Sequence, residues 1–153
     1  MTRYARVCLE GTVAVPLAQS EAFELFTPSG ERRWVQGWDP SFPALERDET
    51  KPGTVFQTTH HHLVTWVVVA CDRPRSITYA NVSGNNRAGL VRVDCEPSQG
   101  RTTAKVSYDM TALSDDGDAV LREFAAKYQR YMRQWQDAIA AAVATSGGGH
   151  PRR

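Results

Sequence analysis

The chain has 153 residues, of which 41% are hydrophobic and 23% charged, and this balance is typical of a globular domain rather than a disordered segment. Its 18 basic and 17 acidic residues nearly cancel, and no predicted element concentrates positive charge. This argues against nucleic acid as a partner. The three cysteines have no paired spacing and no signal segment is recognised, so we expect a cytoplasmic protein. The longest apolar stretch, residues 63–71, is too short for membrane insertion.

The first predicted element is a strand over residues 6–15. Its apolar residues Val7, Leu9, Val13 and Val15 alternate with a wetter set, which is the period of a half-buried strand. Gly11 falls on the apolar side, where it is expected to mark a bend or the close approach of another element.

Two short helices are predicted next. Ala22, Leu25 and Phe26 recur at helical spacing within residues 17–26, and the Thr27-Pro28 pair stops this helix. Thr27 is expected to cap a second short helix that has Pro28 in its first position.

The middle of the chain predicts strands separated by breaks that are rich in Pro, Gly, Asn and Asp. The predicted strands cover residues 44–48, 54–61, 63–72, 76–82, 88–96 and 102–113. Short turns between consecutive strands require antiparallel pairing, because parallel strands need long crossovers. With the first strand, this predicts a seven-stranded curved antiparallel sheet.

A long C-terminal helix is the clearest predicted element. Asp115, Asp116 and Asp118 suit the positive end of a helix dipole, and one of them is expected to cap the helix. Apolar residues then recur at steps of three and four: Leu121, Phe124, Ala125, Tyr128, Met132, Trp135, Ile139, Ala142 and Val143. One helix of about 40 Å is expected, at 1.5 Å per residue. Glycines after Ser146 end it, so we expect one domain over 1–146 and a disordered tail over 147–153.

The order strand, two short helices, strands and long helix is that of an α+β helix-grip fold. Three stretches carry a closer likeness: PLAQSEAFELFTPSGERRWVQGWDP at 16–40, PGTVFQTTH at 52–60 with TWVVV at 65–69, and TAKVSYDMTALSDDG at 103–117. They resemble the START-related superfamily of polyketide cyclases and lipid-transfer proteins, SRPBCC. That superfamily includes lipid carriers, hormone binders, aromatases and co-chaperones, so the resemblance implies a fold and no single activity.

A long helix over a curved sheet leaves a gap that bulky side chains or a ligand must fill. We therefore predict a cavity for a small hydrophobic molecule of lipid, polyketide or aromatic type. The candidate lining residues are Trp34, Trp38, His60, Trp66, Tyr79, Tyr108, Tyr128, Met132 and Trp135. The resemblance implies that the segment with Trp34 and Trp38 closes one end of the cavity. A plain core role is the alternative for these side chains, and the strand faces that turn inward stay open.

The run His60-His61-His62 raises the question of a metal. On a strand, His60 and His62 would face one way and His61 the other, so at most two of them could bind one ion. A zinc or iron site needs a third protein ligand, and Trp66 stands where a glutamate would be wanted. We expect no metal and no cofactor. A hydrogen-bonding group in the cavity wall or an exposed strand end are the alternatives.

Acid and base groups for an enzyme could come from His60, Tyr79, Arg92, Asp94 and Tyr108. Arg92 and Asp94 share one strand face, so they also fit a solvated ion pair. Nucleophile elbows, phosphate loops and nucleotide fingerprints are absent from the sequence, and we assign no catalytic residue. A polyketide-type cyclase, aromatase or dehydratase is the first alternative to a binding protein, and a co-chaperone-like interaction module is the second. Monomer and homodimer both stay open.

Overall fold

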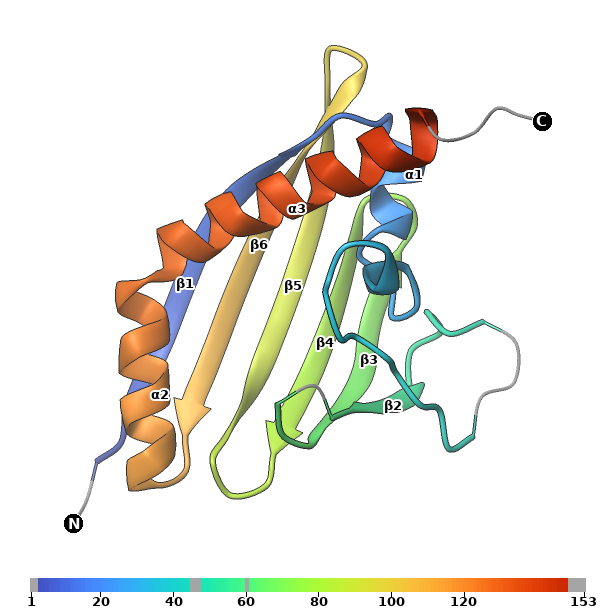
Figure 1. Ribbon diagram of the computed structural model, residues 1–153. Helices are drawn as coiled ribbons and strands as arrows, with labels where there is room; N and C mark the ends of the chain where they lie inside the picture. Colours follow the sequence, from blue (N-terminus) through green and yellow to red (C-terminus); the bar gives the residue numbers. More distant parts are fainter. Residues whose placement is uncertain (1–2, 45–47, 60, 149–153) are drawn as a thin grey trace.

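The computed structural model describes residues 3–44, 48–59 and 61–148. Its elements, in chain order, are β1 (Arg6–Val15), α1 (Gln19–Glu24), the 3-10 helix η1 (Gly30–Arg33), β2 (Val55–Thr58), β3 (Val64–Asp72), β4 (Ser76–Ser83), β5 (Arg87–Ser98), β6 (Arg101–Ala112), α2 (Asp115–Ala126) and α3 (Tyr128–Gly148). One sheet is crossed by the C-terminal helices, while α1 and η1 lie at one end of it (Figure 1). The predicted α+β helix-grip fold is confirmed.

The sheet is antiparallel, with the order β1-β6-β5-β4-β3-β2. Within the described ranges it has six strands, so the prediction of seven was wrong. Ala44 and Asp48 lie outside any strand, and the residues between them are outside the described part of the chain. This segment contributes one bridge, between Ser41 and Gln57. Pro40 and Pro43 flank that bridge, and proline has no N–H with which to extend a ladder.

The turn between β5 and β6 is tighter than predicted. Pro97 and Ser98 belong to β5, where they pair with Thr102 and Arg101, instead of forming part of the break. The two-residue turn Gln99-Gly100 has φ angles of 54° and 81°. Positive φ at both positions is the geometry of a hairpin turn that matches the twist of its strands.

Thr27 joins the two short helices at the end of the sheet. Its Oγ1 donates a hydrogen bond to the Glu24 carbonyl oxygen at 2.8 Å and accepts one from the Gly30 N–H at 3.1 Å. The 3-10 helix begins at Gly30, so Pro28 precedes this helix and does not occupy its first position as predicted.

The predicted C-terminal helix is divided at Lys127 into α2 and α3, and in Figure 1 the two meet at an angle. α2 packs on β6 and β1, whereas α3 packs on β1 and extends to Gly148, beyond the predicted end. At the join, the Tyr108 ring contacts both Phe124 and Tyr128, with centroid distances of 5.0 and 5.8 Å. We attribute the break to these contacts, because neither glycine nor proline occurs between residues 118 and 146.

The N-terminus of α2 is capped by Ser114, whose Oγ accepts a hydrogen bond from the Gly117 N–H at 3.1 Å. The prediction that an aspartate caps this helix was wrong. Asp118 instead bonds the Ala5 N–H at 2.6 Å and pairs with Arg122 at 2.7 Å. The acidic residues of the first turn still favour the helix dipole.

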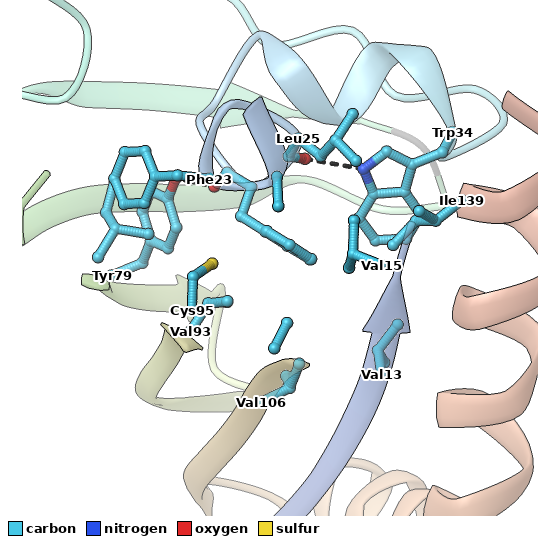
Figure 2. Close-up of a cluster of buried hydrophobic side chains, with 14 of the residues drawn as sticks. Val13, Val15, Phe23, Leu25, Trp34, Tyr79, Val93, Cys95, Val106 and Ile139 are labelled. Carbon is cyan, nitrogen blue, oxygen red and sulfur yellow. Dashed lines mark hydrogen bonds between the residues drawn. The ribbon is translucent and has the colours of Figure 1, made fainter. Parts of the chain in front are cut away.

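The core lies under α1 and η1 and against α3. Figure 2 shows Phe23, Leu25 and Ile139 among the buried side chains, with the Trp34 Nε1–H donating to the Leu25 carbonyl oxygen at 2.7 Å. None of the described helices combines the length and apolar character needed to cross a bilayer.

Gly11 marks the closest approach of α3 to the sheet. A Cβ atom at this position would lie 2.8 Å from Met132 Cγ and 3.1 Å from Tyr128 Cε2. The predicted close approach of another element at Gly11 is confirmed.

Candidate functional site

An internal cavity of about 210 Å³ lies between the sheet, η1 and α3. Five of the predicted site residues line it together: Trp38, Trp66, Tyr79, Tyr108 and Trp135. Among the other described residues of the wall, Glu31 is the one that is not apolar. The structure therefore gathers five of the nine predicted lining residues around one partly open cavity.

Strand alternation decides which side chains reach this cavity. Tyr79 on β4 and Val91 and Val93 on β5 are buried, whereas the neighbouring Leu90 is 44% exposed on the other face. Tyr108 on β6 pairs directly with Val91 on β5, so these two side chains lie on the same face of the sheet. The question of which strand faces turn inward is thus answered by the register of the sheet.

A second cavity of about 190 Å³ adjoins the first and is covered by α2. Trp66 and Tyr108 line both cavities, so these two side chains separate them. Arg87 lines the second cavity, and burial lowers the pKa of its guanidinium group. The Arg87 guanidinium bonds Asn86 Oδ1 at 2.6 Å and contacts His62 Nε2 at 2.9 Å.

The aromatic wall of the first cavity is braced by ring contacts. Phe56 and Trp66 are stacked with an interplanar angle of 3° and a centroid distance of 5.8 Å. Trp38 meets Trp66 edge-on at 5.8 Å, and Tyr79 meets it edge-on at 6.0 Å. Each ring restricts its neighbours, so the wall is preorganised for a flat apolar molecule.

Most polar atoms of this wall are already bonded within the protein. The Trp38 Nε1–H donates to the Pro28 carbonyl oxygen at 2.7 Å, and the Trp66 Nε1–H donates to Thr58 Oγ1 at 3.0 Å. The Tyr79 hydroxyl donates to the Phe26 carbonyl oxygen at 2.6 Å. These three groups contribute aromatic surface to a ligand, but no free donor.

Glu31 and Tyr108 differ from the three bonded groups above in the hydrogen bonding of their side chains. The Glu31 carbonyl accepts the Trp34 and Val35 N–H groups, but within the described part of the chain its carboxyl has no hydrogen-bond or ion-pair partner. Burial raises the pKa of this carboxyl to about 8. The Tyr108 hydroxyl likewise has no partner there, and burial, followed by the nearby Glu31 carboxyl, raises the pKa of its phenol. The same two causes, in the same order, raise the pKa of Tyr79.

Sequence reasoning missed Glu31. The residue stands in a GERRWV run, beside Arg32 and Arg33, and looks like part of a solvated turn. The available signal was its spacing of three and four from Trp34 and Val35, which places these residues on related faces of a helical turn.

Trp34, Tyr128 and Met132 line neither of the two cavities. All three are buried in the core. The Tyr128 hydroxyl donates to the Val106 carbonyl oxygen at 2.7 Å, and Met132 packs over Gly11. Their packing is that of core residues, which was the alternative considered for them.

His61 and His62 do not continue a strand. His60 lies outside the described residues, while His61 and His62 are exposed in the bend before β3. The prediction that a strand reaches His61 was wrong, because β2 ends at Thr58. Among the described residues, no group of three or more His, Cys, Asp or Glu side chains is placed to hold a metal ion.

Arg92 and Asp94 form an ion pair on the outer face of the sheet, with Nη2 and Oδ1 2.8 Å apart. The Arg92 side chain is 52% exposed, and neither residue lines the two internal cavities. The solvated-pair interpretation is confirmed, so these residues leave the set of candidate acid and base groups.

Comparison with known proteins gives the fold and little more. No family model matches the chain, and no curated protein matches its sequence. Solved structures do match. Mll3558 from Rhizobium loti is 18% identical with a TM-score of 0.64, and the match covers 92% of this chain and 99% of that one.

Two further structures match over nearly their whole length. Ara h 8.0201 is 15% identical with a TM-score of 0.63, covering 90% of this chain and 99% of that one. Truncated norcoclaurine synthase from Thalictrum flavum is 11% identical with a TM-score of 0.63, covering 99% of each chain. The chain therefore has the helix-grip fold of the Bet v1-like, SRPBCC proteins.

Proposed function

We propose that this protein binds or carries a small, largely apolar molecule of lipid, polyketide or aromatic type between its sheet and α3. The observation that carries the proposal is the partly open cavity of about 210 Å³ with an aromatic wall. Protein interiors contain few voids of this size, and concave apolar spaces with a few polar groups are the usual form of a ligand site.

The size of the cavity favours a compact ligand. At about 210 Å³ it is smaller than typical ligand pockets of roughly 300–1,000 Å³. A longer ligand has to displace Trp66 or Tyr108, because these side chains stand between the first cavity and the second. A fused two-ring molecule suits the first cavity without that movement.

The structural neighbours support a small-molecule site in this fold. One of them is a norcoclaurine synthase point mutant in complex with a transition-state analogue, 11% identical to this chain with a TM-score of 0.62. At this identity the likeness carries no substrate over to the present chain. It supports the choice of the interior as the place to look for a ligand.

The test is a titration with tetralin, a fused two-ring hydrocarbon, followed by isothermal calorimetry. Val91→Phe places extra volume inside the cavity, since Val91 lines it and is 5% exposed. Leu90→Phe is the matched control, because Leu90 is the adjacent residue on the outer face. We expect wild type and Leu90→Phe to bind alike and Val91→Phe to bind at least about tenfold more weakly. Failure of the wild type to bind, or equal affinity of all three proteins, contradicts the proposal.

An enzymatic role has one specific observation in its favour. Two groups that can donate or accept a proton, Glu31 and Tyr108, converge on the same apolar cavity. Such groups are what a polyketide-type cyclase, aromatase or dehydratase needs next to a carbonyl or an enol. For this candidate, Tyr108→Phe should abolish turnover of a poly-β-keto substrate while tetralin still binds. Turnover unaffected by that change rules out Tyr108 as the acting group.

A further inference from the structure

The free polar atoms of the first cavity are few. The indole N–H groups of Trp38 and Trp66 and the hydroxyl of Tyr79 are bonded to protein oxygens. Within the described residues, the Glu31 carboxyl and the Tyr108 hydroxyl line the same cavity with no protein partner. A buried polar group without a partner carries a desolvation cost, and a ligand that supplies the partner removes this cost.

The protonation states of Glu31 and Tyr108 decide which chemical group of a ligand they can bind. The titratable side chains that face Glu31 are Tyr79 from β4 and Tyr108 from β6, and α3 contributes Trp135. Among the residues that the structure describes, the lining of this cavity includes no Lys, Arg or His, and Arg87 of β5 lies in the second cavity. With a pKa of about 8, raised by burial, and no cationic side chain among the described lining residues, the Glu31 carboxyl keeps its proton at neutral pH. A carboxylic acid held neutral by an apolar site is a hydrogen-bond donor.

We propose that Glu31 and Tyr108 form a pair of hydrogen-bond donors that together bind one carbonyl oxygen on an otherwise apolar ligand. The geometry places both side chains on the wall of one cavity, so that a flat molecule against the aromatic rings meets them at its edge. The inference rests on the proposed binding function, and it narrows the ligand to an aromatic or polycyclic ketone.

Three probes with one skeleton separate the possible chemistries. Tetralin carries no polar group, 1-tetralone adds a carbonyl oxygen, and 1-aminotetralin adds an ammonium group. At pH 6 we expect 1-tetralone to bind about tenfold more tightly than tetralin, because its carbonyl oxygen accepts two hydrogen bonds in a largely apolar site. As the pH rises through about 8, Glu31 loses its proton and this preference should shrink.

Variants assign the effect to the two residues. Glu31→Leu and Tyr108→Phe should each lower the ketone preference by about threefold or more, while tetralin binding persists. Glu31→Gln keeps an N–H donor but does not titrate, so it should keep the preference and lose its pH dependence. Glu21→Gln removes an exposed acid from α1 and serves as the charge-matched control, with wild-type behaviour expected.

The outcomes distinguish this inference from the proposed function. If tetralin binds and 1-tetralone shows no preference, the donor pair is wrong and the apolar binding function stands. If 1-aminotetralin binds most tightly and gains affinity as the pH rises, the site holds a cation and the donor pair is again wrong. If none of the probes binds, both proposals fall.

Discussion

Glu31 should make the stability of the fold depend on pH. Its carboxyl has a pKa of about 8 in the folded protein against an ordinary value of 4.5 in an exposed chain. Between these two values the folded state binds more protons than the unfolded state, so stability falls as the pH rises through this window. Below about pH 4.5 the side chain is protonated in both states and has no effect on the pH dependence.

The size of the effect follows from the two values. A pKa difference between 4.5 and about 8 corresponds to an upper limit of about 5 kcal/mol once the pH exceeds the folded value. At pH 7 the same relation gives about 3 kcal/mol. The Glu31 side chain borders cavity space, which lessens the penalty on the charged form, so we expect measured values somewhat below these.

Urea denaturation at pH 5, 7 and 9, followed by circular dichroism, measures the effect. Relative to wild type, Glu31→Gln should gain stability progressively from pH 5 to pH 9, by about 2–4 kcal/mol over that range. The buried amide has its own cost, but this cost does not change with pH. Glu21→Gln, at an exposed site, should parallel wild type. A constant difference between wild type and Glu31→Gln at all three pH values would refute the reasoning.

Three further changes test other parts of the structure. Gly11→Val should lower the free energy of unfolding by about 1–3 kcal/mol, because its side chain would overlap Met132; an unchanged urea midpoint would show that α3 adjusts freely. Ser114→Ala should cost about 1 kcal/mol in the same assay through loss of the α2 cap, and no loss would mean that the cap is dispensable. Burial raises the pKa of Cys95 to about 12, so iodoacetamide should modify the exposed Cys8 in the native protein and Cys95 only after unfolding, as read by mass spectrometry; equal native rates would contradict the burial of Cys95.

The strand pattern carried most of the fold prediction. The turn signals between strands predicted antiparallel neighbours, and β2 to β6 pair in that order, whereas β1 at 6–15 pairs with β6. The pattern of residues 44–48 predicts an extra strand only when Pro40 and Pro43, which precede it, are left out of account. The break at Lys127 had no local signal, since it depends on how Phe124 and Tyr128 pack on Tyr108. Contacts between distant parts of the chain override helix propensity there.

Part of the site was also predictable from the strand pattern. Trp66, Tyr79 and Tyr108 are large aromatic residues on strands, and the register alone places them on one face. Glu31 depends on where η1 lies over the sheet, which no local pattern fixes. Its neighbours Arg32 and Arg33 are exposed, so in the sequence the half-buried Glu31 looks like part of a charged surface.

The break between α2 and α3 at Lys127 affects how the volumes of the two cavities can vary. A single straight helix would touch the curved sheet only near its two ends. The volume left beneath it would then depend on the curvature of the strands alone. Because the helix is divided, α2 and α3 pack on the sheet separately. The position of α3 affects the first cavity, and the position of α2 affects the second. Substitutions near residue 127 that change the angle between α2 and α3 can therefore enlarge one cavity and shrink the other without any change in strand pairing.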